Sequence, residues 1–390
     1  MKRMPSTLPE PTEFEQALSA RLQALICEEI DRQGGVISFG RYMGMALYMP
    51  GLGYYAAGAQ KFGAGGDFVT APELSPLFSQ CLAQQCRQVL DEISQGDILE
   101  LGAGSGIMAA DILAELERQQ RMPAHYFILE LSAELKHRQQ QTLQEKVPDL
   151  LDRVVWLDSL PQNFSGVVLA NEVLDAMPVT CFEKREDTLL ERGVTYEGDV
   201  LLWAERPADT ALTQAVLDCE QTGWMLPYQS EINLALTAWF ETVYKSIQQA
   251  VVILIDYGYP RSEYYHPQRQ TGTLICHYRH HVTLDPFQWP GLQDITANVD
   301  FTAVSEAGES SGFELAGYTT QSWFLMANGL ETFYLQAEAQ NEQQRVELSR
   351  QIKLLTLPAE MGERFHVIAF SKKVDLPLSG FSVRDLSHRL

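Results

Sequence analysis

The sequence predicts an α/β fold in which a largely parallel sheet is covered by helices on both faces. Three observations indicate this fold. Short apolar runs alternate with longer amphipathic segments, as strands and helices do in such proteins. The run at 97–101 breaks into glycines at every second position and then gives way to a helical pattern. The most apolar run, at 251–255, lies far downstream, so we expect both halves of the chain to contribute to one sheet.

The predicted strands are short apolar runs bounded by polar or turn residues. In chain order they are 97–101, 126–129, 154–157, 166–170, 251–255, 313–318 and 365–370. A polar helix is expected at 134–145, between the second and third strands. We expect the last two strands to close the sheet as an antiparallel pair.

The region before the first strand is predicted to be helical. Apolar residues recur with helical spacing across 11–32. Ser38 is placed to cap a second helix, predicted to run to residue 48. A glycine-rich loop is expected at 63–72, followed by a long helix at 72–93.

The alternation of strands and helices is interrupted at 179–249. Alternating polar and apolar residues at 182–206 are typical of hairpins, and helices are predicted at 211–222 and 230–248. Because this insertion follows a strand end, where open sheets bind ligands, we assign it to the substrate side. The chain is thus divided into an N-terminal helical region, a first core half, an inserted α+β substrate subdomain, a second core half and a C-terminal tail: 1–95, 96–178, 179–249, 250–372 and 373–390.

Composition and cysteine spacing restrict the class of protein. The formal net charge is −22, from 29 basic and 51 acidic residues, so a nucleic acid would be repelled. Six widely spaced cysteines with no C-x-x-C pair indicate a reducing compartment. No apolar run is long enough for a membrane span, and the start of the chain lacks the features of a signal or transit peptide. We expect a soluble cytoplasmic protein; the sequence is compatible with a homodimer but does not specify one.

The turn after the first strand is the most informative feature for function. Gly102, Gly104 and Gly106 allow the backbone to bend sharply and to approach a ligand closely. A strand, a glycine turn and a helix together are typical of a nucleotide-type site at the carboxyl end of a parallel strand. The G-x-G-x-G spacing differs from the G-x-G-x-x-G fingerprint of dinucleotide sites.

Acids close to this turn favour S-adenosylmethionine as the cofactor. Glu100 is a poor neighbour for a phosphate but a good partner for an ammonium group. Glu130 is placed to accept hydrogen bonds from both ribose hydroxyls, and Asp158 to accept one from the adenine amine. A nicotinamide cofactor remains an alternative, because an acid occupies a similar place in dinucleotide sites. The candidate cofactor-binding residues are Glu100, Gly102, Ala103, Gly104, Ser105, Gly106, Glu130, Leu131, Asp158 and Thr70.

The segment after the fourth strand carries an amide and two carboxylates. Asn171, Glu172 and Asp175 would face the reactive methyl group if the cofactor lies over the glycine turn. A guanidinium is a poor nucleophile because it stays protonated; two carboxylates can clamp it and help to remove a proton. We therefore take these three residues as candidate catalytic residues. The alternative is that Asp175 caps a helix and Glu172 is merely solvated.

Several motifs make the chain resemble the MidA family of class I methyltransferases. They are G-D-F-x-T at 66–70, the glycine turn with its preceding acid at 100–106, N-E-x-L-D-A-x-P at 171–178, D-Y-G at 256–258 and V-D-F at 299–301. The glycine turn is shared by many methyltransferases, whereas the G-D-F-x-T, N-E-x-L-D-A-x-P and V-D-F runs together are much more specific. The match extends over most of the chain.

This resemblance implies a Rossmann-like methyltransferase core, S-adenosyl-L-methionine as the donor, and symmetric dimethylation of an arginine in a partner protein. In the mitochondrial relatives, which act in complex I assembly, that arginine belongs to a complex I subunit. Asp67, in the glycine-rich loop, and Asp256 would form a second acidic tier toward the substrate. The candidate substrate-binding residues are Asp67, Phe68, Pro72, Asp256 and Tyr257.

Two other functions stay open at this point. An assembly chaperone that binds the cofactor without turnover would carry the same glycine turn, and a small-molecule N-methyltransferase could use the same amide and carboxylates. A metal site is not expected, because no cysteine or acid completes a recognisable ligand set with His277, His280 and His281.

Overall fold

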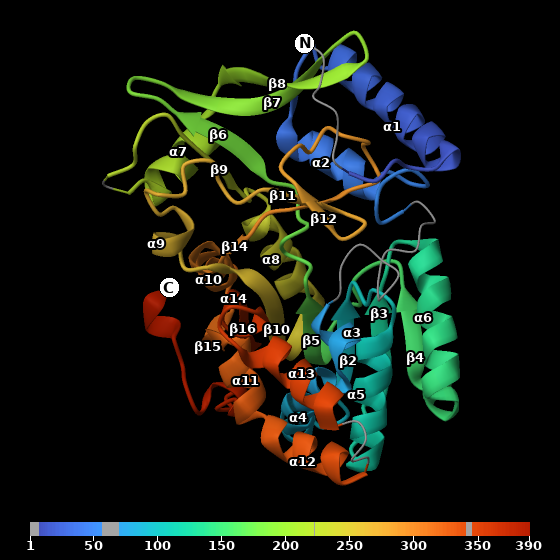
Figure 1. Cartoon of the computed structure of the whole chain (residues 1–390). Helices are drawn as coiled ribbons and strands as arrows, with labels where there is room; N and C mark the ends of the chain where they lie inside the picture. Colours follow the sequence, from blue (N-terminus) through green and yellow to red (C-terminus); the bar gives the residue numbers. More distant parts are fainter. Residues whose placement is uncertain (1–7, 57–69, 222, 341–344) are drawn as a thin grey trace. The chain divides into compact units, whose positions relative to one another are not determined.

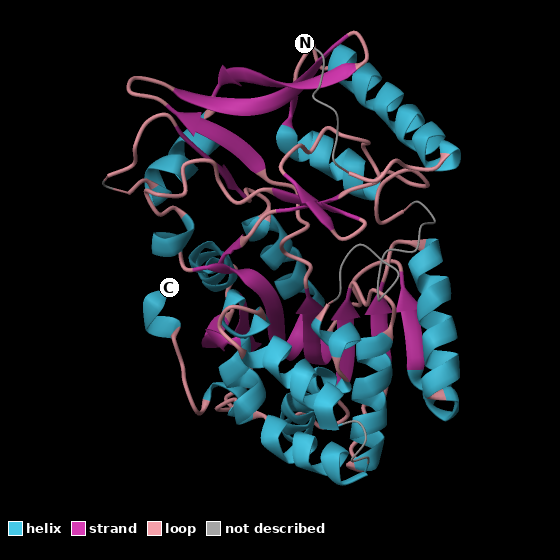
Figure 2. Ribbon diagram, in the orientation of Figure 1, coloured by secondary structure: helices cyan, strands magenta, loops and turns pink. Residues whose placement is uncertain are grey.

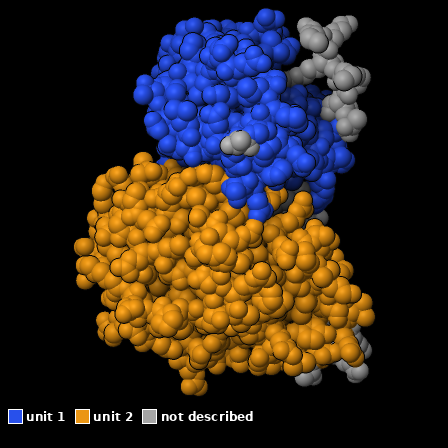
Figure 3. All heavy atoms as spheres, turned by 90° about the vertical axis from the view of Figure 1, so that its left-hand side faces the viewer, with its two compact units in different colours: residues 1–68, 175–235, 262–298 blue, residues 69–174, 236–261, 299–390 orange. Residues whose placement is uncertain are grey.

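Two units make up the described part of the chain (Figure 3). The strands of unit 1 form two sheets and those of unit 2 form one (Figure 1). The computed structural model describes residues 8–56, 70–221, 223–340 and 345–390. Unit 1 comprises Met1–Phe68, Asp175–Ala235 and Ser262–Asn298, and unit 2 comprises Val69–Leu174, Leu236–Arg261 and Val299–Leu390.

These units group the chain differently from the five segments expected from the sequence. The N-terminal helical region shares unit 1 with most of the insertion. Unit 1 also takes residues 262–298, whose short strands pair with one another and not with the core sheet. The last helix expected in the insertion belongs to unit 2.

The strands of unit 2 are β2 (Asp97–Leu101), β3 (Tyr126–Leu129), β4 (Val154–Leu157), β5 (Phe164–Asn171), β10 (Ile247–Tyr259), β14 (Val299–Asp300), β15 (Glu314–Thr320) and β16 (Phe365–Lys372). They form one sheet in the order β15-β16-β10-β5-β2-β3-β4, with β14 paired to β10. The strands from β10 to β4 are parallel, whereas β16 runs antiparallel to both β10 and β15. The predicted parallel sheet and its closing antiparallel pair are confirmed.

The helices of unit 2 are α3 (Ala71–Leu74), α4 (Pro76–Glu92), α5 (Ile107–Arg118), α6 (Ala133–Lys146), α8 (Leu236–Ser246), α10 (Phe301–Ser310), α11 (Gln321–Ala327), α12 (Leu330–Gln340), α13 (Arg345–Thr356) and α14 (Met361–Arg364). The single helix predicted at 72–93 is wrong, because the chain is extended at Ser75. The Ser75 hydroxyl instead accepts a hydrogen bond from the amide of Leu77 and caps α4.

Helices cover both faces of the unit 2 sheet, as predicted (Figure 2). Val167 and Leu169 of β5 belong to an apolar cluster that also contains residues of α4 and α5. Ala369 of β16 also belongs to that cluster, so the next residue, Phe370, points to the opposite face of the sheet. On that face the ring of Phe370 lies 5.2 Å from the ring of Phe240 in α8.

Unit 1 contains antiparallel sheets and several helices. One sheet has the order β1-β7-β6-β9, with β8 paired to β7, and the other has the order β12-β11-β13. Its strands are β1 (Ile37–Ser38), β6 (Thr180–Lys184), β7 (Leu189–Glu197), β8 (Val200–Pro207), β9 (Tyr228–Ile232), β11 (Ile275–Tyr278), β12 (His281–Thr283) and β13 (Asp294–Thr296). Its helices are α1 (Glu13–Arg32), α2 (Phe39–Tyr48) and α7 (Thr210–Cys219). The short helix α9 (Arg261–Tyr264) begins at the last residue of a unit 2 segment, and its other residues belong to unit 1.

The hairpins predicted at 182–206 and the Ser38 cap are confirmed. The helix predicted from residue 230 is wrong at its start, because β9 occupies 228–232 and pairs with β6. The buried carboxylate of Glu231 in β9 accepts hydrogen bonds from Tyr264 and Thr273. These two residues lie far from Glu231 in the sequence, and their hydrogen bonds stabilise β9.

Candidate active site

The parallel strands of unit 2 end in register. Leu101 pairs with Leu129 on one side and with Ala170 on the other. Leu129 in turn pairs with Leu157. The residues that follow these strand ends therefore lie along one edge of the sheet, and they are Gly102, Glu130, Asp158 and Asn171.

The order of the strands reverses between β2 and β5. Along the chain, β3 and β4 follow β2 toward one edge of the sheet, and β5 and β10 lie toward the other. Ligands of doubly wound sheets bind at such a switch point, outside the carboxyl ends of the strands. The predicted glycine turn follows β2 at this point.

The glycine turn has the backbone that its residue type favours. Gly102, Gly104 and Gly106 have φ of +67°, +51° and +84°, in the left-handed region. A Cβ on Gly106 would lie 3.0 Å from the Cα of Gln139 in α6. Gly106 therefore meets both a conformational and a steric requirement, and α5 begins directly after it.

Glu100 lies inside unit 2, only 1% exposed. The hydroxyl of Tyr126 in β3 donates a 2.7 Å hydrogen bond to its carboxyl. The pKa of Glu100 is raised to about 7: burial is the main cause, the hydrogen bond from Tyr126 lowers the pKa, and the neighbouring charge of Glu130 raises it.

Glu130 is also buried, and both of its carboxylate oxygens have a partner. One accepts a 2.8 Å hydrogen bond from the amide of Ser132, and the other a 3.0 Å bond from the side chain of Gln139. Burial raises the pKa of Glu130. Gln139 was not predicted as a site residue, because in the sequence it is one of three consecutive glutamines in a polar helix.

The remaining candidate cofactor residues differ in exposure. Leu131 is 80% exposed, and the mostly exposed carboxylate of Asp158 forms an ion pair with Lys136. Ala103 is buried in the glycine turn. Ser105 donates a hydrogen bond to the carboxylate of Glu73, which was not among the predicted site residues.

That hydrogen bond joins the turn to α3, where two further candidates lie. Thr70 is the residue before the first turn of α3, and its side chain makes no cap hydrogen bond there. Pro72 is buried in that first turn. Asp67 and Phe68, from the same sequence run, lie outside the described residues.

The segment after β5 is held against the end of β10. Glu172 has a φ of +53°, unusual for a residue other than glycine, and its amide donates a 2.9 Å hydrogen bond to the carbonyl of Ile255. The side chain of Asn171 donates to the Glu172 carboxylate at 3.1 Å. A backbone outlier of this kind is common in functional loops.

Asp175 is buried and is the first residue of a unit 1 segment, whereas Glu172 belongs to unit 2. The carbonyl of Asp175 accepts a hydrogen bond from the amide of Ala297. The alternative that Asp175 caps a helix is wrong, because the described residues from 171 to 179 contain no helix and β6 follows. The expected pairing of Glu172 with Asp175 stays a prediction.

Asp256 holds the backbone of this region together. It is fully buried, and its two oxygens accept 2.9 Å hydrogen bonds from the amides of Leu174 and Tyr257. The ring of Tyr257 packs edge-on against Phe365. These contacts give Asp256 a structural role beside the substrate role expected from the sequence.

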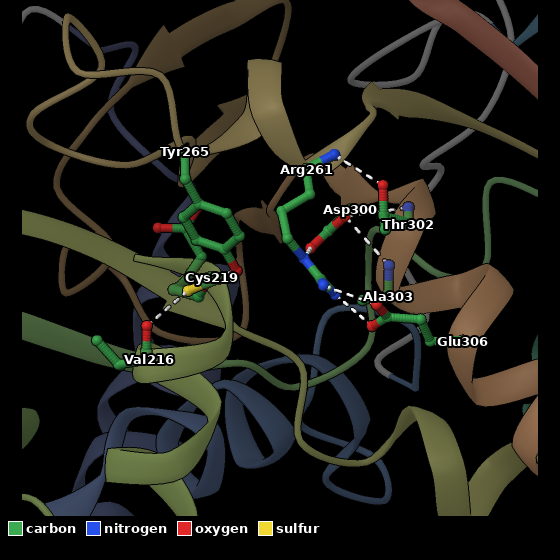
Figure 4. Close-up of polar contacts among 9 residues, drawn as sticks. Val216, Cys219, Arg261, Tyr265, Asp300, Thr302, Ala303 and Glu306 are labelled. Atoms are coloured by element: carbon green, nitrogen blue, oxygen red, sulfur yellow. Dashed lines mark hydrogen bonds and ion pairs between the residues drawn. The ribbon is translucent and has the colours of Figure 1, made fainter. Parts of the chain in front are cut away.

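The V-D-F run has a structural explanation as well. Asp300 caps α10 through the amides of Thr302 and Ala303, and its carboxylate contacts Arg261 at 3.3 Å (Figure 4). Arg261 also pairs with Glu306 of α10. The run thus fixes the start of α10 next to the end of β10.

Neither a metal cluster nor a membrane helix is found in the described residues. They contain no group of three or more His, Cys, Asp or Glu side chains arranged to hold a metal ion. None of their helices combines the length and apolar character that crossing a bilayer requires.

The sheet of unit 2 is doubly wound, with a glycine turn at its switch point and an acid at the end of the next strand. This arrangement defines a class of enzymes that bind nucleoside cofactors. Over residues 81–319 the sequence matches the family described as S-adenosyl-L-methionine-dependent methyltransferase. The chain belongs to this methyltransferase family, which confirms the resemblance found in the sequence.

Individual relatives agree with this assignment. A candidate methyl transferase from Burkholderia thailandensis, solved bound to S-adenosyl-homocysteine, has a TM-score of 0.94 and 43% identity, covering 98% of this chain and 100% of that one. The mitochondrial protein arginine methyltransferase NDUFAF7 of Danio rerio is 24% identical, over 89% of both chains. Its Drosophila melanogaster homolog is 29% identical, over 89% of this chain and 86% of the relative.

Proposed function

We propose that this protein transfers a methyl group from S-adenosyl-L-methionine to an arginine of a partner protein. The observation that carries this proposal is the common edge of the sheet at which the glycine turn, Glu130 and Asn171 lie. Membership of the methyltransferase family supports the donor, and the arginine methyltransferase relatives support the acceptor.

The residues at this edge fit the proposed cofactor. The backbone of the glycine turn admits a ligand without a Cβ in its way, and the Glu130 carboxylate can accept from ribose hydroxyls. The side-chain oxygen of Asn171 is buried and has no hydrogen-bond partner among the described residues. A buried polar atom of this kind is costly unless water or a ligand satisfies it, and the site of a polar ligand supplies such a partner.

The roles of the other candidate cofactor-binding residues follow from the chemical groups of S-adenosyl-L-methionine. The bound cofactor would supply an electrophilic methyl group on a sulfonium. Glu100 would attract its ammonium group, and Asp158 would accept from its adenine amine. Leu131 and Thr70 would flank the adenosine, and Ala103 and Ser105 would complete the turn.

On the substrate side, Glu172 and Asp175 would clamp the guanidinium, with Asn171 orienting it. Two carboxylates draw positive charge toward the nitrogens that they bind and accept the proton that is lost as a nitrogen is methylated. Pro72, Asp256 and Tyr257 would shape the approach of the substrate, together with Asp67 and Phe68.

The finer features are part of the same proposal. The target would be an exposed arginine, symmetrically dimethylated, in a protein such as a respiratory complex I subunit. A reducing compartment, the cytoplasm, suits the six free cysteines. Homodimerisation stays a prediction.

Comparative mass spectrometry tests this function. Digests from cells with and without the gene are searched for symmetric dimethylarginine, and the gene is restored as wild type and as Asp175→Asn. We expect one or a few arginines to lose the modification without the gene and to regain it only with wild type. An unchanged methylarginine profile, with full rescue of any growth defect by Asp175→Asn, would favour a non-catalytic assembly chaperone.

A further inference from the structure

Gln139 connects three parts of the candidate cofactor site. Its side-chain nitrogen donates to the carbonyl of Gly104 at 3.1 Å and to the carboxylate of Glu130 at 3.0 Å. Its side-chain oxygen accepts a 3.0 Å hydrogen bond from the indole nitrogen of Trp156. Gln139 is fully buried, so these contacts are shielded from water.

The contacts fix the orientation of the Gln139 amide. The indole of Trp156 can only donate, so the amide oxygen must face it and the amide nitrogen must face Gly104 and Glu130. Both hydrogens of that nitrogen are then used. Glu130 is held from its other side by the Ser132 amide at 2.8 Å, so the plane of its carboxylate is set by two donors.

The close approach of α6 to the glycine turn reinforces this arrangement. A Cβ on Gly106 would meet the Cα of Gln139 at 3.0 Å, so the helix backbone at residue 139 lies directly against the turn. The glycine turn from β2, the acid from β3 and the indole from β4 therefore share one buried amide.

We infer that Gln139 is a positioning residue, which sets the Glu130 carboxylate for the ribose hydroxyls of the cofactor and ties it to the glycine turn. This inference rests on the proposed function. Gln139 acts through Glu130, and its loss should weaken recognition of the ribose selectively.

The test compares two ligands by isothermal titration calorimetry. One is S-adenosylhomocysteine, and the other is its analogue without the two ribose hydroxyls, S-(2′,3′-dideoxyadenosyl)homocysteine. Gln139→Met keeps the length of the side chain and removes its hydrogen bonds. We expect this variant to bind S-adenosylhomocysteine about 10- to 100-fold more weakly, as for lost hydrogen bonds to a charged group. The affinity for the analogue should change by less than about twofold.

Two further variants make the result decisive. Gln140→Met is the same change at an exposed site on the same helix and should leave both affinities unchanged. If Gln139→Met does not fold, Gln139→Glu is used in its place, because glutamate has the same shape as glutamine and keeps an acceptor for Trp156. The second oxygen of this glutamate would face the Glu130 carboxylate, so the same selective loss of affinity is expected.

Equal losses for both ligands would overturn the inference, because they would indicate a merely structural role. Unchanged affinity for S-adenosylhomocysteine would also overturn it. A wild-type protein that binds neither ligand would overturn the proposed function, and the inference with it. The two failures are therefore distinguishable.

Discussion

The hydroxyl of Tyr126 donates a 2.7 Å hydrogen bond to the buried carboxyl of Glu100, joining β3 to β2 just before the glycine turn. Burial raises the pKa of Glu100 from an ordinary value of 4.5 to about 7. Because the pKa is higher in the folded state, Glu100 contributes most to stability at low pH, where it is protonated in both states. That contribution is lost as the pH rises from about 4.5 through about 7.

The replacement Glu100→Gln tests this pH dependence. Glutamine keeps an acceptor for Tyr126 but has no proton to lose, so the variant should lack the decrease in stability. For wild type, the decrease attributable to Glu100 is roughly 3 kcal/mol over that pH range. Urea unfolding of both proteins without ligand, at pH values on either side of 7, measures the difference. Parallel pH profiles for the two proteins would show that Glu100 is not responsible.

Glu130→Ala should weaken cofactor binding. We expect S-adenosylhomocysteine to bind about 10- to 100-fold more weakly, because the carboxylate would accept hydrogen bonds from the ribose. Calorimetry measures the dissociation constant, and Glu145→Ala, which removes an exposed carboxylate from α6, serves as the control. If Glu130→Ala bound the ligand as tightly as the control does, the ribose assignment would be incorrect.

Asp175→Asn should separate binding from chemistry. The buried carboxylate would bind the guanidinium rather than the cofactor, so affinity for S-adenosylhomocysteine should be retained. Methyl transfer to the target should fall by at least about 100-fold, as for loss of a general base. Label transfer from the donor is compared with that of Asp187→Asn, an exposed change in unit 1. A parallel loss of ligand affinity and transfer would contradict this division of roles.

Gly106→Ala should destabilise unit 2 and impair the cofactor site. The left-handed backbone costs about 1–2 kcal/mol for alanine, and the contact with Gln139 adds to this cost. Gly198→Ala is a matched control, since Gly198 has a φ of +58° with nothing within 4 Å of its would-be Cβ. Urea unfolding should show a larger loss for Gly106→Ala. Equal losses would mean that α6 does not restrict the turn.

The sequence was sufficient to predict the main strands of unit 2 along the chain and the glycine turn. Both depend on local patterns, because buried parallel strands are short apolar runs and left-handed turns favour glycine. The break at Ser75 and the strand β9 were missed, because a cap and a distant hydrogen-bond network decide them. Gln139 was missed for the same reason, since its partners come from the ends of three different strands.

A crystal structure of this protein with S-adenosylhomocysteine tests the central claim most directly. The account predicts the ribose hydroxyls within hydrogen-bond distance of the Glu130 carboxylate, the homocysteine over the glycine turn and the sulfur facing Asn171. A ligand bound away from the carboxyl edge of the unit 2 sheet, or a ribose that does not contact Glu130, would contradict it.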